Sequence, residues 1–234
     1  MGLEIFTIEI DGEQGLDVRI RSDKATVHDL LQALQAPADD PGVFKPYHKE
    51  RYAVCRGCTY NCCKSNDITV DLVAAEALAK KLDMGLKRFT ESYLKLSSDI
   101  PYPEFKRRPC PFLTDNRCTV YHERALICRL YLCTPMTDKL EKLRAAVLLA
   151  GEAALRHRLI EFNLGPKAWQ SRVIRDTLRR RYSKGEMSRA EWQEGSEQLE
   201  ILLNNNPFHN GKGYADVLLQ ECCTDKLWAT LIKD

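Results

Sequence analysis

The ten cysteines of this chain constrain its fold more than any other feature of the sequence. Eight of them lie between residues 55 and 133, and the other two are adjacent at 222 and 223. An even number of cysteines can indicate a disulfide framework, but that pattern suits short secreted chains. The N-terminal segment MGLEIFTIEIDG carries glutamates where a secretory signal needs basic residues and an apolar run, so we expect a cytoplasmic protein. In that reducing compartment, dense cysteines are more typical of metal ligands than of disulfides.

The spacing of the eight clustered cysteines suits metal binding. Cys55 and Cys58 form a CxxC pair, in which the two intervening residues make a turn that aims both sulfurs at one ion. Gly57 can adopt the positive φ that such a turn often needs. The later cysteines lie in irregular, proline-broken segments, which metal ligation can hold in place. The candidate metal ligands are Cys55, Cys58, Cys62, Cys63, Cys110, Cys118, Cys128 and Cys133.

The irregular spacing of the later cysteines favours an iron–sulfur cluster over zinc. Structural zinc sites usually pair two regular knuckles, whereas a second pair here would be Cys110 with Cys118 or Cys128 with Cys133. A cluster is wider than a single ion and accepts ligands from separate loops. We therefore expect an iron–sulfur cluster of the [4Fe–4S] type, and zinc is the alternative.

The adjacent Cys62 and Cys63 bear on the number of metal centres. Neighbouring side chains point apart in an extended chain or a helix, so these two are not expected to share one ion. One could bind metal while the other packs, or each could serve a different centre. The clustered thiols also exceed the usual ligand set of one centre. We expect one main cluster, and an incomplete second centre with an open coordination position is the further option.

The segment CRGCTYNCC at residues 55–63 resembles the CxxCxxxCC signature of the YkgJ-like family, which is described as zinc- or iron-chelating. The second half of the family pattern follows as CPFL at 110–113 and CTVYHERALICRLY at 118–131. The chain departs from the pattern at Ala125 and Leu132, where the family usually has proline. Carried over by position, the resemblance implies that all clustered cysteines except Cys133 belong to the chelating set. Cys133 is a candidate by proximity alone.

Two arginines are candidate cofactor-binding residues. Arg124 and Arg129 match the family pattern, and their ion pairs or N–H···S hydrogen bonds would offset the charge of thiolate ligands. We interpret Arg107 and Arg108 as solvated side chains. His122 lies four residues after Cys118 in the sequence, but we interpret it as a surface histidine because the cysteines already suffice as ligands.

Outside the cysteine region the hydrophobic periodicity is mostly helical. Residues 3–10 and 16–21 alternate apolar and polar side chains and predict a β-hairpin. Thr26 caps a short helix that Pro37 should end, and helices are expected near 69–83 and 86–96. The C-terminal half predicts helices from Thr137 to about 163, around 169–182, after a capping box at Ser188, and over 214–232.

These patterns predict a mainly α-helical protein with a small N-terminal β-hairpin, an irregular metal-stapled cysteine-rich middle and a helical C-terminal half. We divide the chain into residues 1–36 (hairpin and short helix), 37–135 (metal-binding region) and 136–234 (helical region). The formal net charge of +2 predicts no general attraction to nucleic acid or to a membrane. The basic stripe within 167–189 is interpreted as a solvated helix face.

The expected function is that of a metal-binding protein with a structural, electron-transfer or sensing role and an unidentified protein or redox partner. One alternative is a binding module whose fold is stapled by zinc. Another is an enzyme, because the same cysteine signature occurs in flagellin lysine N-methylases, and the resemblance would then imply methyl transfer to a protein lysine. No S-adenosylmethionine motif is recognisable, and GxSxG, HExxH and P-loop motifs do not occur in the sequence.

Overall fold

The computed structural model describes residues 2–39, 62–98, 102–169, 171–203 and 206–233. Its N-terminal hairpin pairs β1 (Leu3–Ile10) with β2 (Glu13–Ile20) in antiparallel fashion. Asp11 and Gly12 form the two-residue turn, and both have positive φ, 51° and 82°. The predicted hairpin is confirmed. Its turn is shorter than the DGEQG segment suggested, because residues 13–15 extend the second strand.

Helix α1 (Val27–Asp39) follows the hairpin and begins where the sequence predicts. The Thr26 hydroxyl accepts a hydrogen bond from the Asp29 amide (3.2 Å), and the Asp29 carboxylate accepts one from the Thr26 amide (3.0 Å). The prediction that Pro37 ends the helix is wrong, because Pro37 lies inside its last turn. Ala38 is 1% exposed, so burial of the final turn holds the helix past the proline.

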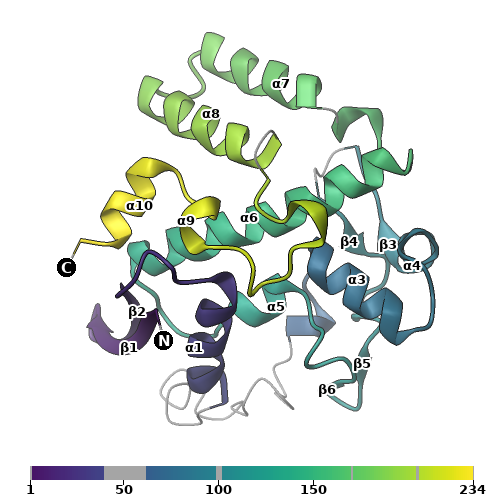
Figure 1. The fold of residues 1–234 in the computed structure, drawn as a ribbon, viewed down its shortest axis with the longest axis horizontal. Coiled ribbons are helices and arrows are strands. Elements are labelled where there is room, and N and C mark those ends of the chain that lie inside the picture. Colours follow the sequence, from purple (N-terminus) through teal and green to yellow (C-terminus); the bar gives the residue numbers. More distant parts are fainter. Residues whose placement is uncertain (1, 40–61, 99–101, 170, 204–205, 234) are drawn as a thin grey trace.

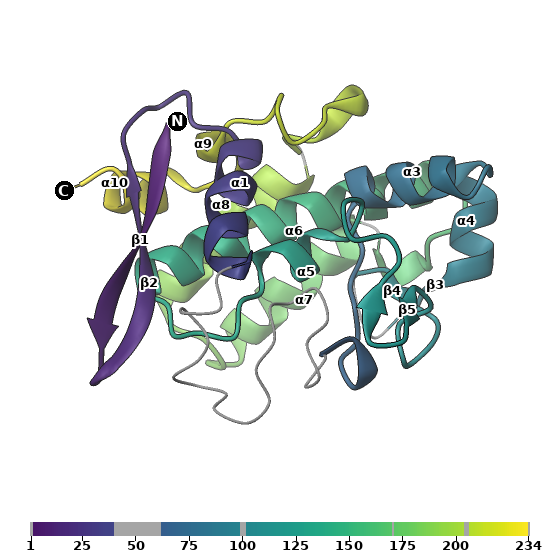
Figure 2. The same cartoon turned by 90° about the horizontal axis from the view of Figure 1, so that it is seen from below.

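The molecule is organised around α6 (Asp138–Glu161), a helix of 24 residues. Thr137 caps it by accepting a hydrogen bond from the Leu140 amide at 3.3 Å, as the sequence predicts. Helices α5 and α9 pack against α6 near the centre of Figure 1, and α1 packs against α5. Figure 2 shows the hairpin near one end of α6 and the α3–α4 pair near the other. The central stretch of α6, residues 145–155, is apolar apart from Glu152, which suits a helix that neighbours cover on several sides.

The cysteine-rich middle consists of short elements joined by turns. Helix α3 (Leu72–Lys81) and helix α4 (Leu86–Tyr93) are each shorter than predicted, and α4 runs directly into strand β3 (Leu94–Lys95). The remaining elements are the 3₁₀ turn η1 (Cys62–Lys64), strands β4 (Glu104–Phe105), β5 (Leu113–Thr114) and β6 (Arg117–Cys118), and helix α5 (Leu126–Leu130). Strand β3 pairs with β4, and β5 pairs with β6.

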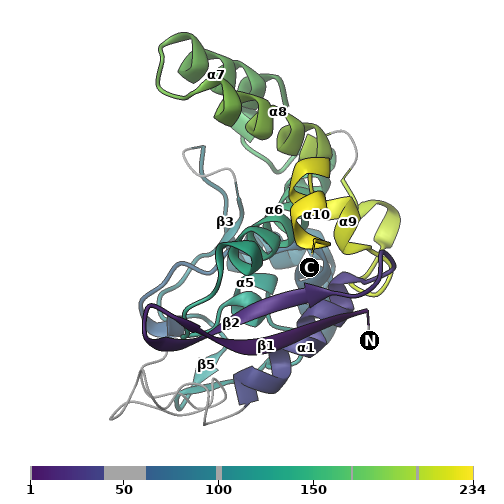
Figure 3. The same ribbon diagram turned by 90° about the vertical axis from the view of Figure 1, so that its left-hand side faces the viewer.

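The C-terminal half is helical but more divided than the sequence suggests. Trp169 belongs to the 3₁₀ turn η2 (Lys167–Trp169), ahead of α7 (Ser171–Ser183). Helices α7 and α8 (Arg189–Leu203) form a hairpin that projects from the body in Figure 3. Its second helix starts with the predicted capping box, in which the Glu191 amide donates to Ser188 Oγ at 3.2 Å and the Ser188 amide donates to Glu191 Oε2 at 2.6 Å.

The single helix predicted over 214–232 is wrong. The chain forms the 3₁₀ turn η3 (His209–Gly211), a short helix α9 (Leu219–Cys222) and a separate helix α10 (Asp225–Leu231). Cys223 is extended between α9 and α10, and Thr224 caps α10 through the Leu227 amide at 3.2 Å. A competing cap therefore divides the segment. Within the described ranges, no helix has both the length and the apolar character needed to cross a bilayer.

Candidate metal centre

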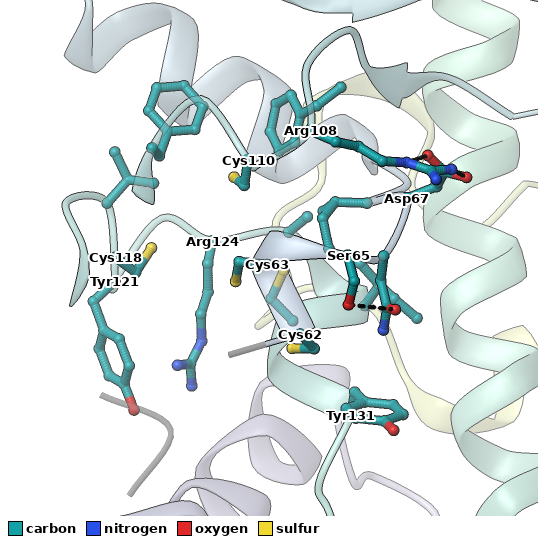
Figure 4. A pocket seen from close by; sticks show the side chains of 18 of the residues that line it. Cys62, Cys63, Ser65, Asp67, Arg108, Cys110, Cys118, Tyr121, Arg124 and Tyr131 are labelled. Carbon is teal, nitrogen blue, oxygen red and sulfur yellow. Dashed lines mark hydrogen bonds and ion pairs between the residues drawn. The ribbon is translucent and has the colours of Figure 1, made fainter. Parts of the chain in front are cut away.

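A cavity of about 460 Å³ lies in the cysteine-rich middle, and six of the predicted ligands line it (Figure 4). These six come from η1, from the loop before β5, from β6, from α5 and from the loop after α5. They are Cys62, Cys63, Cys110, Cys118, Cys128 and Cys133. Cys55 and Cys58 lie outside the described residues. The structure therefore brings together in space all the predicted ligands that it describes.

Backbone hydrogen bonds fix the segments that carry these cysteines. The Cys110 amide donates to the Cys63 carbonyl at 2.8 Å, which ties the loop before β5 to η1. Cys118 lies on β6 opposite Leu113, and the next residue donates its amide to the Phe112 carbonyl at 2.9 Å. Within α5, the Cys128 amide donates to the Ala125 carbonyl at 2.9 Å. Backbone hydrogen bonds at or next to the cysteines therefore hold the segments that form the cavity wall.

Cys62 and Cys63 do not point apart as the sequence suggests. Both line the same cavity, and the Cys63 thiol donates a hydrogen bond to the Cys62 sulfur. That bond lowers the pKa of Cys62 and raises the pKa of Cys63. The expectation assumed regular backbone, whereas these residues form a tight 3₁₀ turn in which χ1 rotation can bring neighbouring sulfurs together.

Burial makes several of these thiols hard to ionise. Desolvation raises the pKa of Cys110 to about 11, and it also raises the pKa of Cys118 and of Cys128. Thiolates are the metal-binding form of cysteine, so the cavity needs positive charge before several cysteines can ionise together. A bound metal supplies such charge directly. Across the described ranges, no three histidine, cysteine, aspartate or glutamate side chains are already arranged to hold a metal ion.

Arg124 brings a positive charge to the cavity from the protein itself. It is 7% exposed, and its guanidinium carbon lies 3.9 Å from the centre of the Tyr121 ring. Its Nη2 donates to Oε1 of Gln35 at 2.8 Å, and its buried Nε has no hydrogen-bond partner within the described part of the chain. Figure 4 shows the side chain extending between Cys118 and the Cys62–Cys63 pair. A buried donor left unpaired beside thiols fits an anionic sulfur group bound in the cavity.

The other basic candidates lie elsewhere. Arg129 packs its guanidinium over the Tyr214 ring, 5.3 Å from the ring centre, and it is not among the described residues that line the cavity. Arg108 lines the cavity and is paired with Asp67. Arg107 and His122 are exposed. The cofactor-binding role of Arg129 stays a prediction, whereas Arg124 lines the cavity together with the cysteines.

Sequence reasoning missed Asp71, which positions the helix that carries Cys128. Asp71 is 1% exposed and caps α3 by accepting from the Ala74 amide at 3.0 Å. The same carboxylate accepts from the Leu126 amide at 2.8 Å, at the first residue of α5. An aspartate just before an apolar helical run is a recognisable N-cap signal. Nothing in the local sequence indicates that it also reaches α5.

Cys222 and Cys223 are buried at 0% and 6% exposure, and neither lines the described part of the cavity.

Cysteines that converge on one cavity from irregular segments, with an arginine among them, define a cysteine-rich metal-chelating domain. Residues 54–146 match the family model described as "CxxCxxCC: Putative zinc- or iron-chelating domain", which is the family that the sequence resemblance predicts. The comparisons with curated proteins and with solved structures give no match.

Proposed function

We propose that this chain holds an iron–sulfur cluster of the [4Fe–4S] type in the cysteine-lined cavity. The observation that supports it best is the convergence of six cysteines on one cavity of about 460 Å³. A structural zinc site closes four ligands around a single ion and leaves no space among them. A cluster carries its own iron and sulfide and therefore needs both room and separated ligands.

The ligands of the proposed cluster come from the cysteine spacing that matches the family pattern and from the cavity wall. Cys55 and Cys58 would act with members of the described set, and Cys62, Cys110 and Cys128 lie on three different segments of the wall. Arg124 would donate its unpaired Nε–H to a cluster or thiolate sulfur. A bound cluster supplies one-electron redox chemistry, which suits electron transfer or sensing with a protein partner in the cytoplasm.

The proposed number of centres is supported by the same cavity. Cys133 lines it although the family pattern has no counterpart for this residue. Six cysteines around one cavity favour one main cluster, because two cubanes would each need a separate ligand set. Iron and sulfide should therefore be quantified for the wild type and for Cys133→Ser. About eight irons per wild-type chain that fall to about four in the variant would contradict the single cluster.

Anaerobic purification followed by metal analysis tests the proposal. The protein should be brown, absorb broadly at about 400 nm and carry about four irons and four sulfides per chain. A colourless protein that holds one zinc, even after anaerobic reconstitution with iron and sulfide, would refute the cluster. It would leave the zinc-stapled binding module as the function.

A further inference from the structure

We infer that Gln35, which lies outside the matched residues 54–146, is a positioning residue of the metal centre: it holds the Arg124 guanidinium beside the cysteines. The inference rests on the proposed metal-binding function and names a residue of α1 that helps to build the site. It therefore assigns the N-terminal part of the chain a role in the centre.

The contacts of Arg124 show what keeps it in place. The flat guanidinium stacks on the Tyr121 ring at 3.9 Å, and its Nη2 donates a hydrogen bond to Gln35 Oε1 at 2.8 Å. Stacking on a ring restrains the guanidinium in one direction only. The hydrogen bond to Gln35 sets its rotation within the ring plane, and so sets where the unpaired Nε–H points.

The amide of Gln35 is suited to this position because it both accepts and donates. Its Oε1 accepts from Arg124, and its Nε2 donates to the Tyr121 hydroxyl at 3.1 Å. Gln35 thus bridges the two side chains that are stacked on each other. An apolar side chain could make neither bond. The three residues form a closed arrangement beside the cavity.

The fold brings Gln35 to this place through helix packing. Helix α1 packs against α5, the helix that carries Cys128, and Arg124 lies just before α5 in the chain. Arg124 lines the same cavity as Cys118 and Cys128. A guanidinium held in this orientation keeps its unpaired Nε–H beside the cavity, where it can donate to a bound sulfur group.

The test measures how fast metal leaves the protein. Wild type, Gln35→Met, Arg124→Leu and the double variant are purified anaerobically with the metal they retain, and release to excess chelator is followed. Methionine keeps the length of glutamine and favours a helix, so α1 should stay folded. Gln35→Met should speed release by roughly tenfold, as loss of an outer partner of a metal site does. Arg124→Leu should speed release at least as much.

The double variant separates positioning from general loosening of the fold. If Gln35 acts through Arg124, Gln35→Met should add nothing in the Arg124→Leu background. The matched control is Gln32→Met, a change at an exposed position of the same helix, which should leave the release rate unchanged. Wild-type release from Gln35→Met, or the same acceleration in both backgrounds, would overturn the inference.

Failure of the inference can be told from failure of the proposed function. The release rates test Gln35 whichever metal the protein retains, whereas the spectrum and the iron and sulfide content test the cluster. A zinc protein whose zinc release follows the predicted pattern would refute the cluster and support Gln35. A protein that retains no metal, even after reconstitution, would overturn both.

Discussion

The Tyr214 hydroxyl donates a 2.7 Å hydrogen bond to Oδ1 of the buried Asp71 carboxylate, although the two residues are far apart in the sequence. The same carboxylate accepts from the amides of Ala74 and Leu126. One side chain therefore joins the start of α3, the start of α5 and the segment that precedes α9. Because α5 carries Cys128, this junction connects the C-terminal segment to the candidate metal centre.

Removing the Tyr214 hydroxyl tests the importance of this junction. Tyr214→Phe keeps the ring under Arg129 but leaves one lone pair of Asp71 without its donor. We expect the free energy of unfolding to fall by about 1 to 3 kcal/mol, the usual effect of unpairing a buried polar group. Urea denaturation measures it. The matched control, Tyr182→Phe, removes a hydroxyl from a residue that is 39% exposed and should change stability by less than about 0.5 kcal/mol.

Gly151 lies in the middle of α6, where Asp71 and Leu126 approach the helix closely. A Cβ at this position would lie 2.6 Å from Leu126 Cδ1 and 2.9 Å from Asp71 Cβ. Gly151→Ala should therefore destabilise the protein by about 1 to 3 kcal/mol, despite the better helix propensity of alanine.

Gly195 in α8 provides the matched control for this substitution. A Cβ there meets Leu178 Cδ1 at 3.7 Å, an ordinary contact, so Gly195→Ala should stabilise by up to about 1 kcal/mol. Thermal or urea unfolding of the two variants should move in opposite directions. A stabilised Gly151→Ala protein would contradict the close packing of α5 and Asp71 against α6.

Glu152 predicts a pH dependence of stability. It is 2% exposed, and burial raises its pKa from 4.5 to about 7. The folded state therefore binds more protons than the unfolded state between these values, and stability falls as the pH rises through this window. Glu152→Gln removes the ionisable group. The stability of the variant relative to wild type should grow by roughly 3 kcal/mol from pH 4 to pH 8. A difference that does not change with pH would contradict the raised pKa.

Two cysteines in different surroundings should behave differently on substitution. Cys128 lines the cavity and lies on α5, whereas Cys222 is 0% exposed at the end of α9, and neither Cys222 nor Cys223 is among the cavity-lining residues described. Cys128→Ala should lose most of the bound metal, because ligand loss removes binding energy that is also folding energy. Cys222→Ala should lose some stability and keep its metal. The metal content per chain of the two variants is measured after anaerobic purification. If Cys222→Ala lost its metal and Cys128→Ala kept it, the metal centre would not lie in the cavity.

The features that the sequence by itself determined are those with a local physical cause. Asp11-Gly12 accepts the positive φ of a two-residue turn, Thr137 and Ser188 cap the helices that follow them, and the spacing of the cysteines predicts the chelating family whose model residues 54–146 match. Each signal lies within a few residues of the structure it produces. The same locality explains the error at Pro37, where burial outweighed the proline stop signal, and the error at Cys223, where a second cap outweighed the helical pattern.

Only the tertiary structure decided which residues meet. The convergence of six cysteines on one cavity, the bond from Arg124 to Gln35 and the bond from Tyr214 to Asp71 all join segments that are distant in the chain. Periodicity shows which face of a helix is apolar but not which neighbour covers it. Those partners are selected by packing around α6, because burying the apolar side chains of this helix brings α3, α5 and α9 against it and α1 against α5.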